Sequence, residues 1–185
     1  MGALDSEKAT AMLDAAEHIL TESGYAALTS RRVAEHLGVK QRLVYYYFKT
    51  MDDLVLETFK RLSERELGRL NAGFASERPL HEIWNVFINT SDSRIVAEFM
   101  ALTNHHPELK VEVINFIEES RKLQIRRLKK SIKNSDLDSI LSADAIALLG
   151  SSLALALNRE SLLGVSLGHS ATHKLIKHFF SLLEE

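Results

Sequence analysis

A short stretch between Thr29 and Thr50 carries the side chains best suited to bind nucleic acid. It has a net charge of +4 over 22 residues, whereas the whole chain has a net charge of −2. The local charge comes from one acid, Glu35, and five bases: Arg31, Arg32, Lys40, Arg42 and Lys49. Concentrated positive charge attracts phosphates. Gln41 and Arg42 are long enough to reach base edges, where glutamine pairs well with adenine and arginine with guanine.

Other side chains of this stretch suit contacts to the DNA backbone. The hydroxyl of Thr29 and the backbone N–H groups that follow it can donate to a phosphate, and Arg31 adds charge there. Tyr45 and Tyr46 offer hydroxyls to phosphate or rings to a thymine methyl group. The predicted DNA-binding residues are Thr29, Arg31, Lys40, Gln41, Arg42, Leu43, Tyr45, Tyr46 and Lys49.

Helices must position these side chains, because apolar residues recur at spacings of three and four along the whole chain. We expect a helix over residues 6–23 that ends at Gly24, and a second helix that Thr29 caps and Gly38 ends. A short helix over residues 41–47 should follow. Helical periodicity places Val44, Tyr47 and Phe48 on its apolar side and Gln41, Arg42, Tyr45 and Tyr46 on its polar side. The aromatic run from Leu43 to Phe48 is also compatible with a buried strand, but no other segment offers that strand a partner.

Two short helices joined by residues 38–40 match the helix-turn-helix layout, in which the second helix enters the major groove of DNA. The later helices are expected at residues 50–71, 79–89, 93–104, 107–133, 137–163 and 166–183. The fold class is therefore all-α, with about nine helices. We place a helix-turn-helix DNA-binding domain at residues 1–50 and a helical body at residues 51–185.

Residues 12–56 resemble the DNA-binding domain of the TetR family of transcriptional regulators. The similarity lies in spaced elements: Leu13-Asp14-Ala15-Ala16, Gly24-Tyr25, Thr29, Val33-Ala34, Gly38-Val39, the segment from Tyr45 to Phe48, and the acidic pair before Leu54. The resemblance implies a homodimer that binds a double-stranded, near-palindromic DNA operator and represses transcription until a small apolar or amphipathic effector releases it. Activation by the same fold, or a helical interaction protein without ligand control, are the alternatives.

The sequence departs from the family pattern at four positions in this domain. Lys40 stands where a small hydroxyl residue is common, so the recognition helix loses its usual N-cap. Arg42 stands where glycine or alanine is frequent, and Leu43 where threonine or serine is frequent. Met51 occupies a position that is usually a phosphate-binding lysine. The N-terminal arm is not basic either, which gives no support to insertion into the minor groove.

The body carries two further candidate sites. Aromatic and apolar residues concentrate in three consecutive helices, and the resemblance favours an effector pocket there; the predicted ligand-binding residues are Trp84, Phe87, Ile88, Phe99, Met100, Thr103 and Phe116. Residues 145–157 are apolar nearly all round, so that helix needs burial on both sides. The last two helices are therefore expected to form the dimer interface, with Leu149, Leu153, Ala156, Leu175, Phe179 and Leu182.

Composition argues against other functions. The chain has no cysteine, which excludes disulfides, thiolate metal sites and a cysteine nucleophile. His169 and His173 lie four residues apart, yet no nearby acid completes a metal site, so we expect no metal and no other cofactor. No phosphate-binding loop or nucleophile elbow is present, so we do not expect an enzyme. No signal-like start and no membrane-length apolar run occur, and we expect a cytoplasmic protein without membrane contact.

Overall fold

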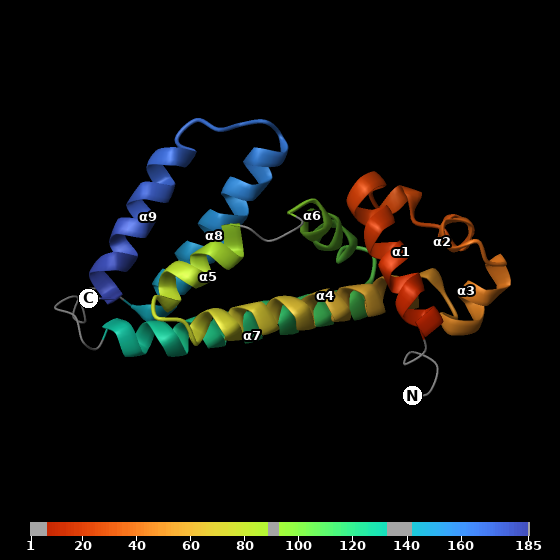
Figure 1. Cartoon of the computed structure of the whole chain (residues 1–185), viewed down its shortest axis with the longest axis horizontal. Helices are drawn as coiled ribbons and strands as arrows, with labels where there is room; N and C mark the ends of the chain where they lie inside the picture. Colours follow the sequence, from red (N-terminus) through yellow and green to blue (C-terminus); the bar gives the residue numbers. More distant parts are fainter. Residues whose placement is uncertain (1–6, 89–92, 133–141, 185) are drawn as a thin grey trace. The chain divides into compact units, whose positions relative to one another are not determined.

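The computed structural model describes residues 7–88, 93–132 and 142–184, and within them every regular element is a helix (Figure 1). The all-α prediction is confirmed, as is the helical rather than extended conformation of residues 41–47. The helices are α1 (Glu7–Ser23), the 3-10 helix η1 (Tyr25–Ala27), α2 (Ser30–Leu37), α3 (Gln41–Tyr47), α4 (Met51–Phe74), α5 (Pro79–Ile88), α6 (Ser93–Leu102), α7 (Pro107–Ile132), α8 (Ala143–Leu162) and α9 (His169–Glu184).

The chain packs into two compact units. The first comprises residues 1–64 and 94–114, and the second comprises residues 65–93 and 115–185. The long helices α4 and α7 each contribute residues to both units. These units are defined by packing rather than by function, so the boundary near residue 50 between a DNA-binding domain and a body stays a prediction.

The core of the first unit forms around α1. Its buried stripe contains Met12, Ala15, Ala16, Ile19 and Leu20, the spacing that predicted this helix. Helix α2 packs on both α1 and α3. Helix α4 adds buried side chains, among them Leu54 and Val55. The ring of Phe59 on α4 contacts Phe99 on α6 edge to face, with 5.1 Å between ring centroids, so α6 belongs to this core.

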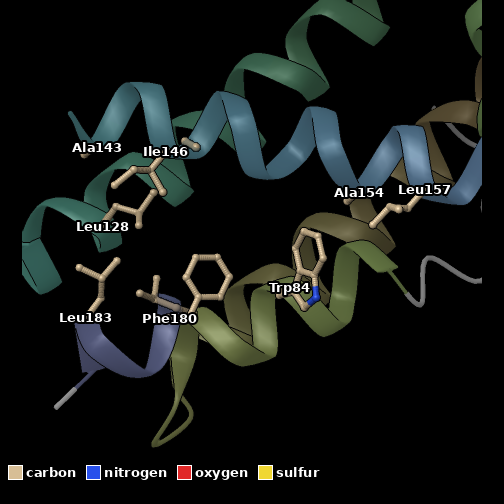
Figure 2. Packing of buried hydrophobic residues seen from close by; sticks show 10 residues of the cluster. Trp84, Leu128, Ala143, Ile146, Ala154, Leu157, Phe180 and Leu183 are labelled. Carbon is tan, nitrogen blue, oxygen red and sulfur yellow. The ribbon is translucent and has the colours of Figure 1, made fainter. Parts of the chain in front are cut away.

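The second unit has its own apolar core between α5, α8, α9 and the last turns of α7. Its buried members are Leu80, Trp84, Leu128, Ala143, Ile146, Ala147, Ala154, Leu157, Phe180 and Leu183. The rings of Trp84 and Phe180 both point toward α8 (Figure 2). Trp84 is the largest side chain in the described residues that is almost fully buried, and it lies edge to face with Phe180 at a centroid distance of 6.4 Å.

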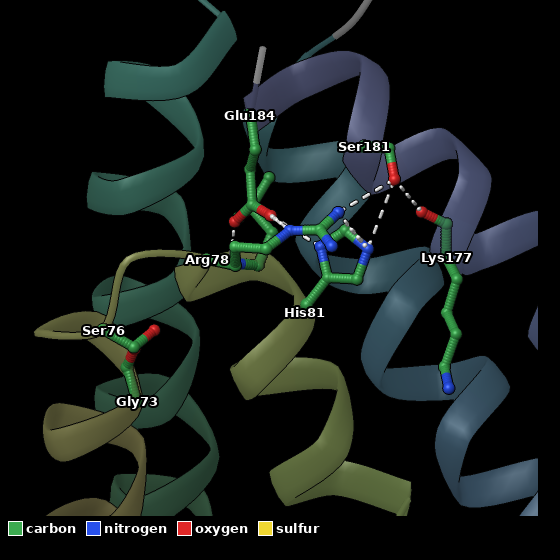
Figure 3. A network of polar contacts seen from close by, with 8 residues as sticks. Gly73, Ser76, Arg78, His81, Lys177, Ser181 and Glu184 are labelled. Atoms are coloured by element: carbon green, nitrogen blue, oxygen red, sulfur yellow. Dashed lines mark hydrogen bonds and ion pairs between the residues drawn. The ribbon is translucent and has the colours of Figure 1, made fainter.

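A buried carboxylate joins the end of α9 to the start of α5 (Figure 3). Glu184 accepts a hydrogen bond from the backbone N–H of Leu80, which stabilises the positive end of the α5 dipole. Its other oxygen lies 2.5 Å from Nδ1 of His81. Arg78 donates through Nη2 to Oγ of Ser181 at 3.0 Å. These contacts fix the C-terminal turn of α9 against α5.

Three helix boundaries differ from the predictions by three residues or more. Helix α4 continues to Phe74 rather than ending at residue 71. Helix α8 begins at Ala143 rather than near residue 137, because the Ser142 hydroxyl accepts a hydrogen bond from Ala145 and acts as its N-cap; residues 137–141 lie outside the described part of the chain. Helix α9 begins at His169, three residues later than predicted. Gly164 and Gly168 have φ values of 81° and 85°, a left-handed conformation that interrupts helical geometry.

Candidate nucleic-acid interface

The turn between α2 and α3 has the geometry of a helix-turn-helix. Thr29 has extended backbone and its hydroxyl accepts a hydrogen bond from the N–H of Arg32 at 3.2 Å, which confirms the predicted N-cap. Gly38 adopts φ 65°, the left-handed conformation that ends α2. The N–H of Val39 then donates to Ala34 at 2.9 Å. This motif reverses the chain within three residues and sets α3 against α2.

Helix α3 presents one apolar and one polar face, as the sequence predicts. Val44 and Phe48 are almost fully buried and anchor the helix to the first unit. Gln41 and Arg42 are exposed, and Tyr45 and Tyr46 keep 46% and 73% of their surface. Leu43 and Tyr47 are half-buried between the two faces. The four exposed side chains form the polar face of α3, which is open to solvent.

Ser30 organises part of this polar face. Its side chain is buried, its hydroxyl donates to the hydroxyl of Tyr45 at 3.0 Å, and it accepts a hydrogen bond from Nε2 of Gln41 at 2.8 Å. Two predicted DNA-binding side chains, Gln41 and Tyr45, are therefore held by one serine of α2. Sequence reasoning missed Ser30, because its role depends on how two helices pack and not on spacing within either one.

The basic residues of the interface fall into two groups. Arg31 donates to Glu35 at 2.8 Å, and this hydrogen bond raises the pKa of Arg31. Arg32 donates to Oγ of Ser23 at 2.8 Å. The second group consists of Lys40, Arg42 and Lys49. These are exposed, and within the described ranges none has an ion pair or a side-chain hydrogen bond, so their charges are available to a phosphate or a base.

The starts of α3 and α4 are stabilised differently. Lys40 is the N-cap of α3 and makes no side-chain cap hydrogen bond, as its departure from the family pattern predicts. Thr50 and Asp53 cap α4 reciprocally: the N–H of Asp53 donates to Oγ1 of Thr50, and the N–H of Thr50 donates to Oδ2 of Asp53, both at 3.0 Å. Met51, at the family's lysine position, is half-buried in the first turn.

Polar contacts fix the neighbouring elements of the first unit. Arg61 on α4 pairs with Asp14 at 2.7 Å and with Glu17 at 2.9 Å, both on α1. The backbone N–H of Tyr25 donates to Glu98 of α6 at 3.0 Å. Burial and the nearby charge of Asp52 raise the pKa of Tyr25. These contacts connect α4 to α1 and η1 to α6 within the unit that carries α3.

The seven predicted ligand-binding residues divide between the two units. Phe99, Met100 and Thr103 belong to the first unit, whereas Trp84, Phe87, Ile88 and Phe116 belong to the second. A small cavity of about 30 Å³ lies in the second unit, and Trp84 and Phe87 are among its walls. The full lining is Leu80, Ile83, Trp84, Phe87, Gln124, Leu128, Ile146, Ala147, Gly150, Ser151 and Phe180.

The predicted dimer residues lie on α8 and α9. Leu149, Leu175 and Leu182 are exposed, at 69%, 66% and 48% of their surface. Leu153 and Phe179 pack partly against the core of the second unit, and Ala156 is half-buried. Further exposed apolar side chains of the same two helices and their connection are Leu148, Leu155, Leu162, Leu163, Val165 and Leu167.

The two histidines that the sequence analysis weighed as metal ligands have other neighbours in the structure. In the described part of the chain, no group of three or more His, Asp or Glu side chains is arranged to hold a metal ion. His169 instead lies 2.9 Å from Glu160, and His173 contacts Trp84 with 5.8 Å between ring centroids. None of the described helices has the length and apolar character needed to cross a membrane.

The helical fold and the turn between α2 and α3 define a helix-turn-helix fold. Residues 12–58 match the family of bacterial regulatory proteins named tetR. This match and the shared fold confirm the resemblance to the TetR family that the sequence shows, and they support a DNA-binding fold. No curated protein matches the chain.

Solved structures show the same fold over nearly the whole chain. A transcriptional regulator from Saccharomonospora viridis in complex with choline is 19% identical, with a TM-score of 0.82, and 96% of this chain aligns with 97% of that one. A TetR transcription regulator from Haloarcula marismortui is 17% identical, with a TM-score of 0.74 and coverage of 95% and 97%. A TetR/AcrR-family regulator from Thermobifida fusca is 18% identical, with a TM-score of 0.69 and coverage of 97% and 98%.

Proposed function

We propose that this protein is a dimeric transcriptional repressor that binds a near-palindromic DNA operator and is released from it by a small molecule. The observation that carries the proposal is the exposed polar face of α3, where Gln41 and Arg42 stand beside Tyr46. The helix-turn-helix geometry around Gly38 presents this face as a recognition helix.

Side chains of the interface have distinct roles in this proposal. Arg42, free of partners within the described residues, contacts a base edge, and its fork of donors matches guanine. Gln41 contacts a neighbouring base while Ser30 holds its amide. The remaining contacts position the protein on phosphates. They come from Thr29, Arg31, Lys40, Tyr45, Tyr46 and Lys49, with Leu43 supplying apolar contact to a base.

The exposed leucines of α8 and α9 support the homodimer. Leu149 and Leu175 keep about two thirds of their surface in the single chain, although a soluble monomer rarely leaves a large contiguous apolar patch uncovered. Two helices from each chain would pack as a four-helix bundle and cover these side chains. A two-fold dimer carries two recognition helices, and it therefore reads two half-sites related by symmetry.

The cavity beside Trp84 supports an effector site in the second unit. Its volume of about 30 Å³ is far below the roughly 300–1,000 Å³ typical of small-molecule pockets, so an effector must bind a wider conformation. The regulator solved with choline has the same fold and favours a small-molecule site in this one. Release from DNA by a factor of a hundred requires about 2.7 kcal/mol of preference for the DNA-incompetent state.

The test is selection of bound sequences from a random DNA duplex library by the full-length protein. We expect enrichment of one motif with two inverted half-sites, spaced by about one helical turn of 10–10.5 base pairs or a multiple of it. Footprinting on the enriched duplex should protect both half-sites. Failure to enrich any motif at low salt would contradict the proposal and favour a helical interaction protein.

A further inference from the structure

The cavity of the second unit combines apolar walls with buried donors that lack acceptors. Most of its lining is aliphatic or aromatic, and none of the lining residues is acidic. Trp84 is 2% exposed, and its Nε1 is buried without a hydrogen-bond partner in the described residues. Figure 2 shows the ring in the gap between α5 and α8. A buried N–H without an acceptor lowers the stability of the folded state. The described side chains provide no acceptor for this one, so a ligand could supply it.

An arginine next to the same cavity also has a buried donor without an acceptor. Arg121 on α7 donates through Nη2 to Oγ of Ser151 at 3.4 Å, and Ser151 lines the cavity. Its Nε is buried without a partner, and among the described residues it forms no ion pair. A partly buried cation without an anion is destabilising. A negatively charged ligand at Ser151 would supply both the charge and the acceptors.

The other polar groups around the cavity do not fill this role. Gln124 uses Nε2 to donate to the carbonyl and hydroxyl oxygens of Ser120, both at 3.2 Å. His173, in contact with Trp84, has its pKa lowered by burial and by the charges of Lys177 and His169. The charges that act on His173 are positive rather than negative.

We infer that the effector is an amphipathic anion whose acceptor oxygens bind Arg121 and Ser151 while its apolar part lies among the aliphatic and aromatic walls, which include Trp84. This inference rests on the proposed effector site of the second unit. The aromatic rings of Trp84, Phe87 and Phe180 could attract a quaternary ammonium ion by cation–π contact, but the unpaired charge of Arg121 opposes a cation.

The experiment uses the fluorescence of Trp84, which is the one tryptophan of the chain. DNA-free protein is titrated, below micellar concentrations, with decanoate, decan-1-ol, decyltrimethylammonium and choline. We expect a saturable change of emission with decanoate and an affinity about tenfold or more above that of the alcohol, which is the effect of a hydrogen bond to a charged group. Equal or tighter binding of either ammonium ion overturns the inference, and so does the lack of a response to decanoate.

Variants of two arginines on α7 locate the anion. Arg121→Met keeps the aliphatic stem and removes the charge, and it should weaken decanoate about tenfold or more while decan-1-ol binds as before. The matched control is Arg126→Met, because Arg126 is exposed on the same helix. Unchanged decanoate affinity in Arg121→Met overturns the inference. If Arg121→Met does not fold, the order of the four ligands' affinities for the wild-type protein decides whether the inference holds.

The proposed repressor function is judged by a separate measurement. Operator binding is assayed without any ligand, so a protein that binds DNA but not decanoate refutes only the inference about the effector. A protein that binds decanoate but selects no DNA motif supports the anionic site and refutes the repressor.

Discussion

At the scale of single residues, the interface divides into side chains that the fold holds and side chains that it leaves free. Ser30 holds Gln41 and Tyr45, which lowers the entropy that these groups lose on binding. Arg42 has no such restraint among the described contacts. We therefore expect the held groups to contribute shape and orientation, and the free arginine to contribute a strong charge-assisted contact.

Replacement of Arg42 tests its role as a base-reading residue. Arg42→Ala should cost about 1–3 kcal/mol of specific binding and relax the preference at one base pair in each half-site. Equilibrium binding of the selected duplex and of its single-base variants measures both effects. Arg126→Ala, an exposed arginine in the second unit, is the control. Full affinity with an unaltered base preference in Arg42→Ala would show that another residue reads the DNA.

A lysine at position 51 should restore a phosphate contact. Met51 lies in the first turn of α4 and is half-buried, so Met51→Lys brings a charge to the edge of the interface. We expect the slope of log K against log salt to become steeper by about one unit. Ala101→Lys, at an exposed alanine of α6, adds the same charge elsewhere in the first unit. An identical slope in wild type and Met51→Lys would mean that residue 51 does not face a phosphate.

The sequence predicted which face of α3 is polar, because helical periodicity alone separates Val44 and Phe48 from Arg42 and Tyr46. It could not predict the Ser30 network, since a hydrogen bond between two helices depends on their packing. The sequence could not predict the cavity beside Trp84 either, because it too depends on how helices pack. Its walls come from four helices, and only Trp84 and Phe87 among them were singled out by local aromatic content.

At the scale of elements, the best predicted boundaries are those where a side chain or a glycine fixes the backbone. Thr29 and Gly38 delimit α2 as their residue types require. The start of α9 was predicted wrongly, because an apolar pattern continued through Gly168 although its positive φ belongs to a turn. The 3-10 helix at Tyr25–Ala27 left no periodic signal in three residues.

The capping box of α4 should contribute to stability. Asp53→Ala removes the acceptor of the Thr50 N–H and the favourable negative charge near the helix start. We expect the free energy of unfolding to fall by about 1 kcal/mol, measured by urea denaturation. Glu64→Ala, an exposed acid later in α4, should change it far less. A loss of the same size in both variants would remove the cap as the explanation.

At the scale of the whole molecule, recognition of a near-palindromic operator requires a dimer. Leu149→Glu together with Leu175→Glu places charges on the exposed apolar faces of α8 and α9, where burial in a dimer would be strongly unfavourable. Sedimentation equilibrium should show a dimer for the wild type at micromolar concentration and a monomer for this double variant. Val111→Glu, at an exposed valine of α7, should remain dimeric. A wild-type monomer at this concentration would contradict the proposed interface.

The helix-turn-helix formed by α2 and α3 is proposed to recognise a specific DNA sequence. Fluorescence anisotropy at physiological salt, with the selected duplex and a scrambled duplex of equal composition, tests this claim most directly. We expect the selected duplex to bind at least about a thousandfold more tightly than the scrambled duplex. We also expect its affinity to fall steeply as salt is raised, because several phosphates are neutralised. Equal affinity for the two duplexes over the whole salt range would contradict it.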